Sequence, residues 1–462
     1  MPELRIDEIA AVVSGQVSRA GRISAFSDFQ FDTRAMAAHS LFFALKSAKA
    51  DGHRYVKDLD AIPGAGAVVR KDFAERHVQV PLIRVADPLR AAQQLAVHVR
   101  EKYRSITYVG ITGSAGKTTT KEFIFQILAS KFRSFRSPQN WNNSIGLPFS
   151  LLKLTGKEEA AVFELAMSDP GIGEIDLLAG ILKPEVAVLL NVFPVHLEFL
   201  KTLENAAKAK AEILNYLPAD GCAFVNGDSA LIRQAVAGKK GCKIFFGSQA
   251  SRDQIVLKEV VRESNGSRLV IDAFGRKEEF VAPLISLAQV EDLFAAILVA
   301  QRLGMTNPEI QAALSALQTL AGRGQVREAG GFVIIDETYN SNPEALKKIL
   351  KWVDGEYRQK KAAVLGDMLE LGADELAFHV EAGRFFSGLH FDLLLAVGAR
   401  AAKIAEGARL SGYPADRIQC FDQAVDAGKY LRAELRPGAV VLFKGSRGVA
   451  LEKAITEFVH EK

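Results

Sequence analysis

The stretch Tyr108-Val-Gly-Ile-Thr-Gly-Ser-Ala-Gly-Lys-Thr-Thr-Thr120 carries the strongest structural signal in the chain. An apolar run over residues 106–111 predicts a buried strand, the glycines interrupt it, and residues 119–130 predict a helix. Glycines let main-chain N–H groups approach phosphate oxygens closely, and the helix N-terminus adds the positive end of its dipole. The stretch is therefore predicted to be a phosphate-binding loop.

The last residues of this loop have the chemistry that a nucleoside triphosphate requires. Lys117 can reach the β- and γ-phosphates, and the Thr118 hydroxyl can ligate Mg²⁺. Position 111 is Ile, not the Gly of the common eight-residue form, so the pattern that stands is Gly113-x-x-Gly116-Lys117-Thr118. A chance glycine-rich turn is the alternative, but the strand–loop–helix order favours nucleotide binding. The residues expected at the phosphates are Gly113, Ser114, Ala115, Gly116, Lys117, Thr118 and Thr119.

Composition narrows the class of protein. A chain of 462 residues suggests about two to four domains. A net charge of +4 without a long basic tract gives no sign of nucleic-acid binding. No apolar run approaches the roughly 20 residues of a membrane span, and the first residues lack a signal-peptide core. Cys222, Cys242 and Cys420 lack metal-ligand spacing, which favours free thiols in a reducing compartment. We expect a cytoplasmic protein without a membrane span.

The order of predicted elements indicates an α/β fold with three domains. Residues 1–87 mix short strands and helices, and residues 88–318 alternate strands and helices around the phosphate loop. Residues 319–462 repeat strand–helix units and resemble a small doubly wound, Rossmann-like domain. Such alternation predicts parallel sheets, in which ligands lie at the carboxyl ends of the strands.

Two side chains that follow strands of the middle region are candidate metal ligands. Glu164 ends an apolar run next to the loop and is well placed for Mg²⁺, although an ordinary exposed glutamate is an equal alternative. His196 follows another apolar run, and a lone histidine is more often structural than a ligand.

A predicted helix over residues 203–217 holds two lysines in different environments. Lys208 has polar neighbours three and four residues away, whereas the corresponding neighbours of Lys210 are apolar. An unpaired buried ammonium is costly, so Lys210 must reach the surface, pair with an anion or be chemically altered. Reaching the surface is the usual outcome. A neutral lysine could instead take up CO₂ as a carbamate, which would supply an oxygen ligand for Mg²⁺.

Several segments together resemble the Mur ligases of bacterial cell-wall synthesis, over nearly the whole chain. Residues 31–34, 41–46 and 51–53 resemble the amino-terminal UDP-binding module of that family, and residues 140–148 resemble its substrate and phosphate segment. Residues 322–323 resemble the entry to the carboxy-terminal domain. The segments 336–343, 366–372 and 444–447 resemble those of the member that adds a D-alanyl-D-alanine dipeptide.

The resemblance implies roles for individual residues. Glu164 matches the magnesium glutamate of the family, His196 the magnesium histidine, and Lys210 the carbamylated lysine, while Thr118 completes the metal set. The catalytic residues implied are Lys117, His196, Lys210 and Arg323, and the further nucleotide contacts are Gln289, Arg323 and Glu337. The substrate-binding residues implied are Thr33, Arg34, Phe43, Ala44, Lys46, Asp51, Gly52, His53, Asn142, Asn143, Tyr339, Asn340, Lys444, Ser446 and Arg447.

The implied activity is ATP-dependent formation of an amide bond. ATP and two Mg²⁺ ions would activate a carboxylate of UDP-N-acetylmuramoyl-tripeptide as an acyl phosphate, which the amine of D-alanyl-D-alanine then attacks. We expect a monomer. The third residue of the tripeptide, meso-diaminopimelate or L-lysine, stays open.

The chain departs from the family pattern at three places. Residues 170–175 carry two extra residues after Glu164. Ala288, Gln289 and Asp292 replace the usual adenine-side residues, which leaves the preference for adenine open, and Glu337 replaces an aspartate.

Three other functions remain as alternatives to the dipeptide-adding ligase. A sibling ligase that adds one amino acid would carry other signatures in its third domain, such as an Asp-Asn-Pro-Arg run. A folylpolyglutamate synthetase shares the architecture but not the UDP module. A nucleotide-dependent switch would have no use for a buried lysine at a metal site.

Overall fold

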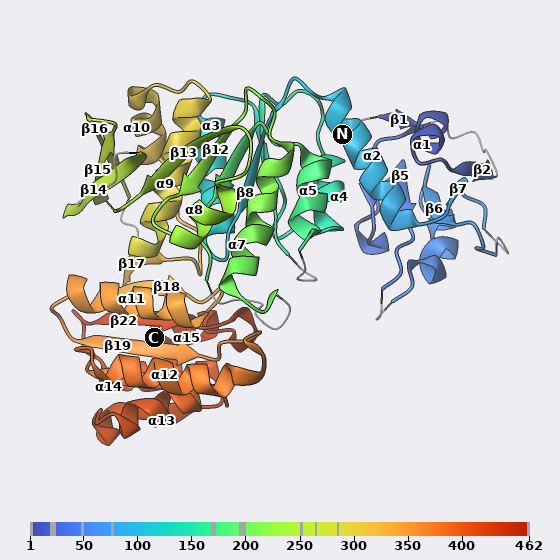
Figure 1. The fold of residues 1–462 in the computed structure, drawn as a ribbon. Coiled ribbons are helices and arrows are strands. Elements are labelled where there is room, and N and C mark those ends of the chain that lie inside the picture. Colours follow the sequence, from blue (N-terminus) through green and yellow to red (C-terminus); the bar gives the residue numbers. More distant parts are fainter. Residues whose placement is uncertain are drawn as a thin grey trace.

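The computed structural model describes residues 3–18, 25–47, 50–74, 78–167, 172–193, 200–249, 253–263, 266–283 and 286–459. The fold is α/β, as the sequence predicts, and its amino-terminal, central and carboxy-terminal parts each centre on a sheet (Figure 1). None of the helices in these ranges is long and apolar enough to cross a membrane.

The amino-terminal part holds a sheet of order β2-β7-β6-β5-β4, in which only β2 runs antiparallel to its neighbour. A short antiparallel pair, β1 with β3, lies beside it. The elements are β1 (Leu4–Arg5), α1 (Ile6–Val12), β2 (Gln16–Ser18), β3 (Ala25–Phe26), β4 (Asp28–Gln30), η1 (Thr33–Ala35), β5 (Ser40–Phe43), η2 (Gly52–Ala61), β6 (Gly66–Arg70) and β7 (Leu82–Val85).

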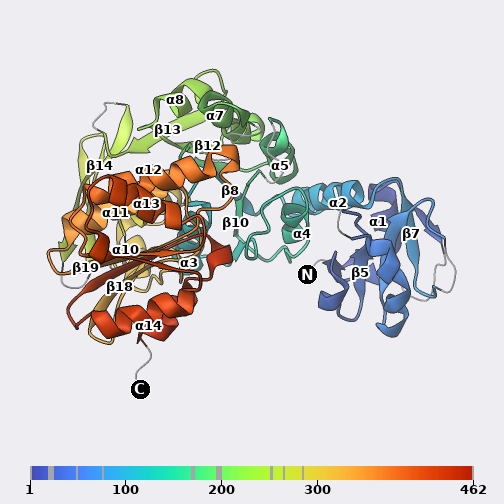
Figure 2. The same ribbon diagram turned by 90° about the horizontal axis from the view of Figure 1, so that it is seen from below.

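Helix α2 (Pro88–Lys102) joins this part to the central sheet. Asp87 caps its N-terminus by accepting hydrogen bonds from the main-chain N–H groups of Leu89 and Arg90. The apolar face of α2 packs on the amino-terminal core, and the helix runs between that domain and α4 (Figure 2).

The central sheet has the order β16-β15-β14-β13-β12-β11-β8-β10-β9 and is parallel from β9 to β14. The antiparallel strands β15 and β16 extend one edge. The strands are β8 (Thr107–Thr112), β9 (Ser134–Arg136), β10 (Ala160–Glu164), β11 (Val186–Leu189), β12 (Cys222–Asn226), β13 (Cys242–Gly247), β14 (Gln254–Glu263), β15 (Gly266–Ala273) and β16 (Arg276–Ala282).

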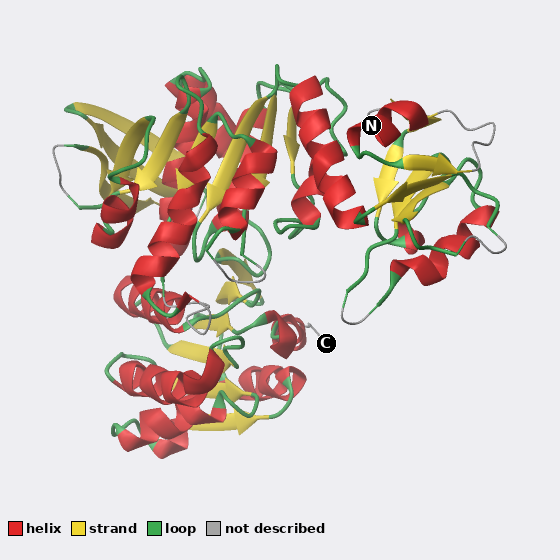
Figure 3. Ribbon diagram, turned by 45° about the vertical axis from the view of Figure 1, so that its right-hand side comes forward, coloured by secondary structure: helices red, strands yellow, loops and turns green. Residues whose placement is uncertain are grey.

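Helices cover both faces of this sheet (Figure 3). Successive side chains of β8 point to opposite faces, so Val109 packs with α3, α9 and α10 while Tyr108 packs with α4, α5 and α7. The helices are α3 (Lys117–Ala129), α4 (Gly146–Leu151), α5 (Glu174–Leu182), α7 (Leu203–Ala211), η3 (Glu212–Tyr216), α8 (Ala230–Val236), α9 (Leu287–Arg302) and α10 (Asn307–Ser315).

The carboxy-terminal sheet has the order β17-β18-β22-β19-β20-β21, with β17 antiparallel and the other strands parallel. Helices α11, α12 and α13 cover one face, and α14 and α15 cover the other. The elements are β17 (Gln325–Ala329), β18 (Phe332–Glu337), α11 (Pro343–Glu356), β19 (Lys361–Gly366), η4 (Gly372–Asp374), α12 (Glu375–Ser387), β20 (Leu393–Val397), α13 (Ala402–Leu410), η5 (Ala415–Arg417), β21 (Ile418–Phe421), α14 (Ala424–Glu434), β22 (Val440–Lys444), η6 (Arg447–Val449) and α15 (Glu452–Val459).

Helix α11 contacts the central domain at two points. Near its start, Lys348 forms a 3.0 Å salt bridge with Glu291 of α9. At its end, Glu356 lies 3.0 Å from the guanidinium of Arg262 on β14, which also donates a 2.7 Å hydrogen bond to the Tyr357 hydroxyl. These contacts hold the carboxy-terminal domain against the carboxyl edge of the central sheet.

Candidate active site

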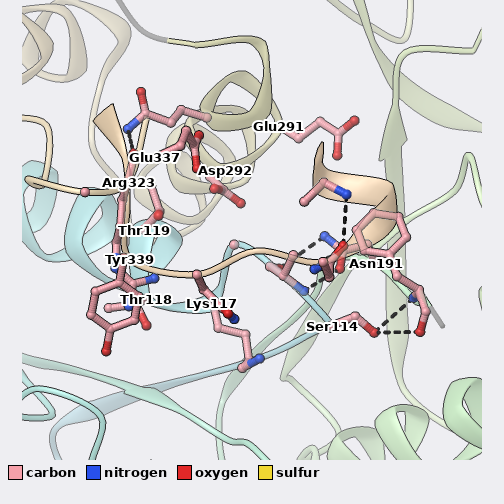
Figure 4. Close-up of a pocket in the computed structure, with 18 of the residues that line it drawn as sticks. Ser114, Lys117, Thr118, Thr119, Asn191, Glu291, Asp292, Arg323, Glu337 and Tyr339 are labelled. Atoms are coloured by element: carbon pink, nitrogen blue, oxygen red, sulfur yellow. Dashed lines mark hydrogen bonds between the residues drawn. The ribbon is translucent and has the colours of Figure 1, made fainter. Parts of the chain in front are cut away.

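A cavity of about 290 Å³ lies between the phosphate loop and the carboxy-terminal domain (Figure 4). Strand β8 precedes the loop, and its neighbours β10 and β11 end beside it, at a point where the strand order reverses. The expected nucleotide contacts that line the cavity are Ser114, Ala115, Gly116, Lys117, Thr118, Thr119, Gln289, Arg323 and Glu337.

Helix α3 begins two residues earlier than the sequence predicts, at Lys117 instead of Thr119. Gly116 adopts a left-handed conformation, with φ 82°, immediately before the helix. A Cβ at Gly116 would lie 2.2 Å from Asp292 Oδ1, so a side chain is excluded there. The early start places Lys117 and Thr118 in the first helical turn, where main-chain N–H groups are free to face an anion.

Asn191, which the sequence analysis missed, holds the phosphate loop in place. Its side-chain oxygen accepts a 2.8 Å hydrogen bond from the Ala115 N–H, and its amide nitrogen donates to the Ala115 carbonyl at 3.2 Å. The Ser114 N–H donates to the Asn191 carbonyl at 3.0 Å. The signal for this residue was its position two residues beyond the end of strand β11, which neighbours β8 in the sheet.

Lys117 lies inside the loop, with its Nζ 2.9 Å from the Gly113 carbonyl oxygen. Burial lowers the pKa of its ammonium, Arg323 lowers it further, and Glu164 and Asp292 compensate only in part. Asp292 accepts a 2.9 Å hydrogen bond from the Thr120 hydroxyl, and burial raises the pKa of its carboxyl well above the usual value. A negatively charged ligand in the cavity would therefore stabilise the charged form of Lys117.

Glu164 is fully buried at the end of β10, so it is not an ordinary exposed glutamate. Its Oε2 accepts a 2.8 Å hydrogen bond from the Thr118 hydroxyl, and its Oε1 accepts one of 2.9 Å from the Asn142 amide. Carboxylate and hydroxyl oxygens suit Mg²⁺, which usually keeps waters and phosphate oxygens as its other ligands. The described residues include no cluster of three or more His, Cys, Asp or Glu side chains for a metal.

The lysines of α7 differ as the helical pattern predicts: Lys210 is 3% exposed, and Lys208 is exposed. Burial, and then the positive charge of Lys117, lower the pKa of Lys210 to about 7. Within the described ranges no group accepts a hydrogen bond from its Nζ. His196 lies outside the described residues, so its expected partnership with Lys210 stays a prediction.

The carboxy-terminal domain brings cations to the same cavity. The Arg323 guanidinium stacks 3.6 Å from the centre of the Tyr339 ring (Figure 4). Lys444 is buried, and its Nζ donates to the Asn340 carbonyl at 3.0 Å and lies 3.4 Å from Glu337 Oε2. Tyr339 and Asn340 follow β18 and Lys444 ends β22, so the carboxyl ends of two neighbouring parallel strands place them at one edge of the sheet.

Two other expected residues of this domain, Ser446 and Arg447, contact neighbouring segments of the same domain. Ser446 accepts a 3.0 Å hydrogen bond from the Leu369 N–H, which joins the segments 366–372 and 444–447. Arg447 lies 5.9 Å from the centre of the Tyr339 ring. Asn143, in the central domain, accepts hydrogen bonds from the N–H groups of Ile145 and Gly146 and thus shapes the segment beside Asn142.

A second cavity, of about 340 Å³, lies in the amino-terminal part, and Ala44, Lys46 and His53 line it. His53 Nδ1 lies 2.7 Å from Asp51 Oδ1, and its Nε2 accepts a 3.1 Å hydrogen bond from the Arg70 N–H. The Asp51 contact thus fixes the ring so that Nδ1 carries the proton.

The other residues expected for the UDP module are not among those that line this cavity. Phe43 is fully buried against Phe149, so only its main chain could contact a ligand. Arg34, next to Thr33 in η1, is exposed and pairs with Asp32 at 2.6 Å. Gly52 begins η2, where an added Cβ would lie 2.9 Å from the Leu45 carbonyl oxygen.

Comparison with known proteins places the chain in a family. Residues 111–300 match the Mur ligase middle domain, and residues 322–447 match the Mur ligase glutamate ligase domain. The chain is 32% identical over 431 residues to the UDP-N-acetylmuramoyl-tripeptide–D-alanyl-D-alanine ligase of Bacillus subtilis, covering 93% of this chain and 92% of that one. The chain belongs to the Mur ligase family.

Solved structures of this Mur ligase's relatives agree with its fold over most of its length. MurF from Acinetobacter baumannii is 26% identical, with a TM-score of 0.88, and the match covers 100% of each chain. MurF from Thermotoga maritima, solved in complex with ADP, is 30% identical with a TM-score of 0.81, and the match covers 93% of this chain and 96% of that one.

Proposed function

We propose that this Mur ligase uses ATP to join D-alanyl-D-alanine to UDP-N-acetylmuramoyl-tripeptide in the synthesis of peptidoglycan precursors. The observation that carries the proposal is the cavity that the phosphate loop and Arg323 of the next domain line together, with the buried Glu164 hydrogen-bonded to Thr118 of the loop. The relatives named for this activity, which match more than nine-tenths of the chain, support the choice of substrates.

The chain's own residues suit the first half of the reaction. The tripeptide carboxylate attacks the γ-phosphorus of ATP, ADP leaves, and an acyl phosphate forms. Lys117 and Arg323 place positive charge beside the phosphates and so stabilise the negative charge that develops during phosphoryl transfer. The amine of the dipeptide then attacks the acyl carbon, inorganic phosphate leaves, and the amine loses a proton. Because the cavity lies between two domains, their approach would also exclude water from the acyl phosphate.

Two Mg²⁺ ions fit the proposal, and they would neutralise charge on the transferred phosphoryl group. Thr118 and Glu164 would hold one ion with phosphate oxygens and water. His196 and a carbamylated Lys210 would help to hold the second. Support for the carbamate comes from the burial of Lys210 and its pKa of about 7, since only a neutral amine reacts with CO₂.

Replacing Glu164 by glutamine should lower the apparent affinity of the enzyme for Mg²⁺, because a neutral amide is a poorer Mg²⁺ ligand than a carboxylate. We expect the Mg²⁺ concentration that gives half-maximal activity to rise by about 10-fold, in line with the loss of one ligand. Titrating Mg²⁺ at saturating ATP measures this. Glu159, exposed near the start of the same strand, gives a control in Glu159→Gln, which should keep the wild-type titration curve.

The acceptor should be the dipeptide and not a single amino acid. With Mg²⁺, ATP and UDP-N-acetylmuramoyl-tripeptide, we expect phosphate release only when D-alanyl-D-alanine is added. D-alanine should stimulate it little, since a site that pairs with the far carboxylate and amide of the dipeptide leaves those groups unsatisfied with a shorter acceptor. A colorimetric phosphate assay with both the meso-diaminopimelate and L-lysine tripeptides measures this.

The same assay separates the alternatives. A better response to single amino acids than to the dipeptide would identify a sibling ligase. If no acceptor stimulates ATP use with any UDP-peptide, the protein is a nucleotide-dependent regulator.

We further infer that the protein acts in the cytoplasm as a monomer. Cys222, Cys242 and Cys420 are free thiols, as expected in a reducing compartment. The cavity that carries the proposal is built from one chain, so a partner copy is not needed to complete it.

A further inference from the structure

Gln289 joins the central domain to the segment that enters the carboxy-terminal domain. It lies in the first turn of α9 and is 2% exposed. Its Oε1 accepts a 3.2 Å hydrogen bond from the Ser286 N–H, and its Nε2 donates a 2.5 Å hydrogen bond to the Arg323 carbonyl. Both partners are main-chain groups of fixed polarity, so the amide has only one satisfactory orientation.

The turn that Gln289 contacts is tightly constrained. Gly322 and Gly324, on either side of Arg323, have φ values of 74° and 81°, which glycine adopts without strain. The Gly322 N–H donates to Asp336 Oδ2 at 3.0 Å, and the Gly324 N–H donates to the Asp336 carbonyl at 2.8 Å. An added Cβ at Gly324 would lie 2.9 Å from Gln289 Cδ. The turn is therefore enclosed between α9 and β18.

This enclosure decides where the Arg323 side chain points. Its guanidinium stacks on Tyr339 and lines the nucleotide cavity, while its carbonyl is held by Gln289. These two hydrogen bonds use one of the two N–H groups and one of the two acceptor positions of the Gln289 amide. The amide thus links the start of α9 to the turn.

We propose that Gln289 is a positioning residue that holds the turn of residues 322–324, and with it the Arg323 guanidinium, in place for phosphoryl transfer. The base contact that the sequence resemblance implied for Gln289 stays a prediction, and the experiments below separate the two roles. The inference rests on the proposed function in one respect, namely that Arg323 acts on the phosphates of ATP.

Two substitutions separate positioning from base recognition. Gln289→Met keeps the length of the side chain and removes both hydrogen bonds, whereas Gln289→Glu removes the donor alone. We expect Gln289→Met to lower kcat by about 10- to 100-fold, since small misplacement of a catalytic group has effects of that size. KM for ATP should change by less than about twofold, and the preference for ATP over GTP should not change, because the base contact is not involved.

Gln126 offers a matched control. Its side chain also bridges a main-chain pair, accepting from the Gln318 N–H at 2.8 Å and donating to the Gln318 carbonyl at 3.0 Å. It joins α3 to the segment after α10 and does not line the nucleotide cavity. Gln126→Met should therefore leave kcat and nucleotide preference at the wild-type level.

A double-mutant cycle tests the route through Arg323. In an Arg323→Ala background, Gln289→Met should lower kcat little further, because the group that it positions is already gone. Trypsin provides a readout that does not depend on activity, since it cleaves after Arg323 when the turn opens. The bond between residues 323 and 324 should be cut faster in Gln289→Met and Gln289→Glu than in the wild type or Gln126→Met.

Other outcomes would contradict the positioning role of Gln289. A changed preference between ATP and GTP at wild-type kcat would show that Gln289 contacts the base. Additive losses in the double mutant, or unchanged cleavage after Arg323, would exclude positioning through the turn. Wild-type protein without acceptor-dependent phosphate release would contradict the proposed function instead, and the cleavage experiment would still report on the turn.

Discussion

Replacing Lys117 by alanine should lower the rate of acceptor-dependent phosphate release by at least about 100-fold, which corresponds to roughly 3–4 kcal/mol of transition-state stabilisation. Lys117 is the cation inside the phosphate loop, and Arg323 approaches from the facing domain and cannot occupy its position. Negative charge on the transferred phosphoryl group would then lack its nearest partner. Steady-state assays of phosphate release at saturating Mg²⁺ measure the loss.

The fold should survive this substitution. The Lys117 side chain forms a hydrogen bond to the Gly113 carbonyl of its own loop and lines a cavity instead of the apolar core. Lys131→Ala, which removes an exposed salt bridge to Glu309, is a suitable control and should keep wild-type activity. Near-wild-type turnover by a well-folded Lys117→Ala protein would contradict the assignment of the loop.

Replacing Lys210 by alanine should nearly abolish activity, while replacing Lys208 by alanine should have a mild effect. The two lysines are two positions apart on helix α7, but only Lys210 is buried and near Lys117. If Lys210 carries a carbamate, its loss removes an anionic ligand and leaves the second metal ion poorly held. Side-by-side assays of the two variants, with circular dichroism to check folding, make the comparison.

The pKa of Lys210 also predicts how carbamate formation depends on pH. Because burial holds the pKa near 7, the neutral amine that reacts with CO₂ becomes the main form as the pH rises above that value. Enzyme prepared free of CO₂ should gain activity on adding bicarbonate, and Lys210→Ala should not. Extra density on Lys208 in a high-resolution map, with an unmodified Lys210, would show the assignment to be wrong.

Local sequence patterns predicted the structure correctly where the prediction depends on a single strand or helix. The strand–helix alternation predicted over residues 319–462 is confirmed: its apolar runs at residues 332–337 and 361–366 form β18 and β19, as strands buried on both faces tend to be apolar throughout. The three- and four-residue spacing around Lys208 and Lys210 separated an exposed lysine from a buried one, since neighbours on a helix surface are fixed by its pitch.

Contacts between distant segments could not be predicted in this way. Asn191 holds the phosphate loop from the segment that follows another strand, and its position beyond that strand does not by itself reveal which loop it contacts. The sequence did not indicate that the Gln289 amide bonds to the main chain of Ser286 and Arg323, and its expected contact with the nucleotide base stays a prediction. The start of α3 was placed two residues late, because the left-handed Gly116 ends the loop against Asp292, far away in the sequence.

Residue types at short, fixed spacings were sufficient to predict the α/β class, the phosphate loop and the resemblance to the Mur ligases. The contacts between distant segments became visible only in the folded chain: Glu164 with Thr118, Arg323 with Tyr339, and Gln289 with the turn of residues 322–324. The physical reason is that such contacts depend on strand order and on how two domains pack, and a hydrogen bond a few ångströms long is not encoded in the residues next to either partner.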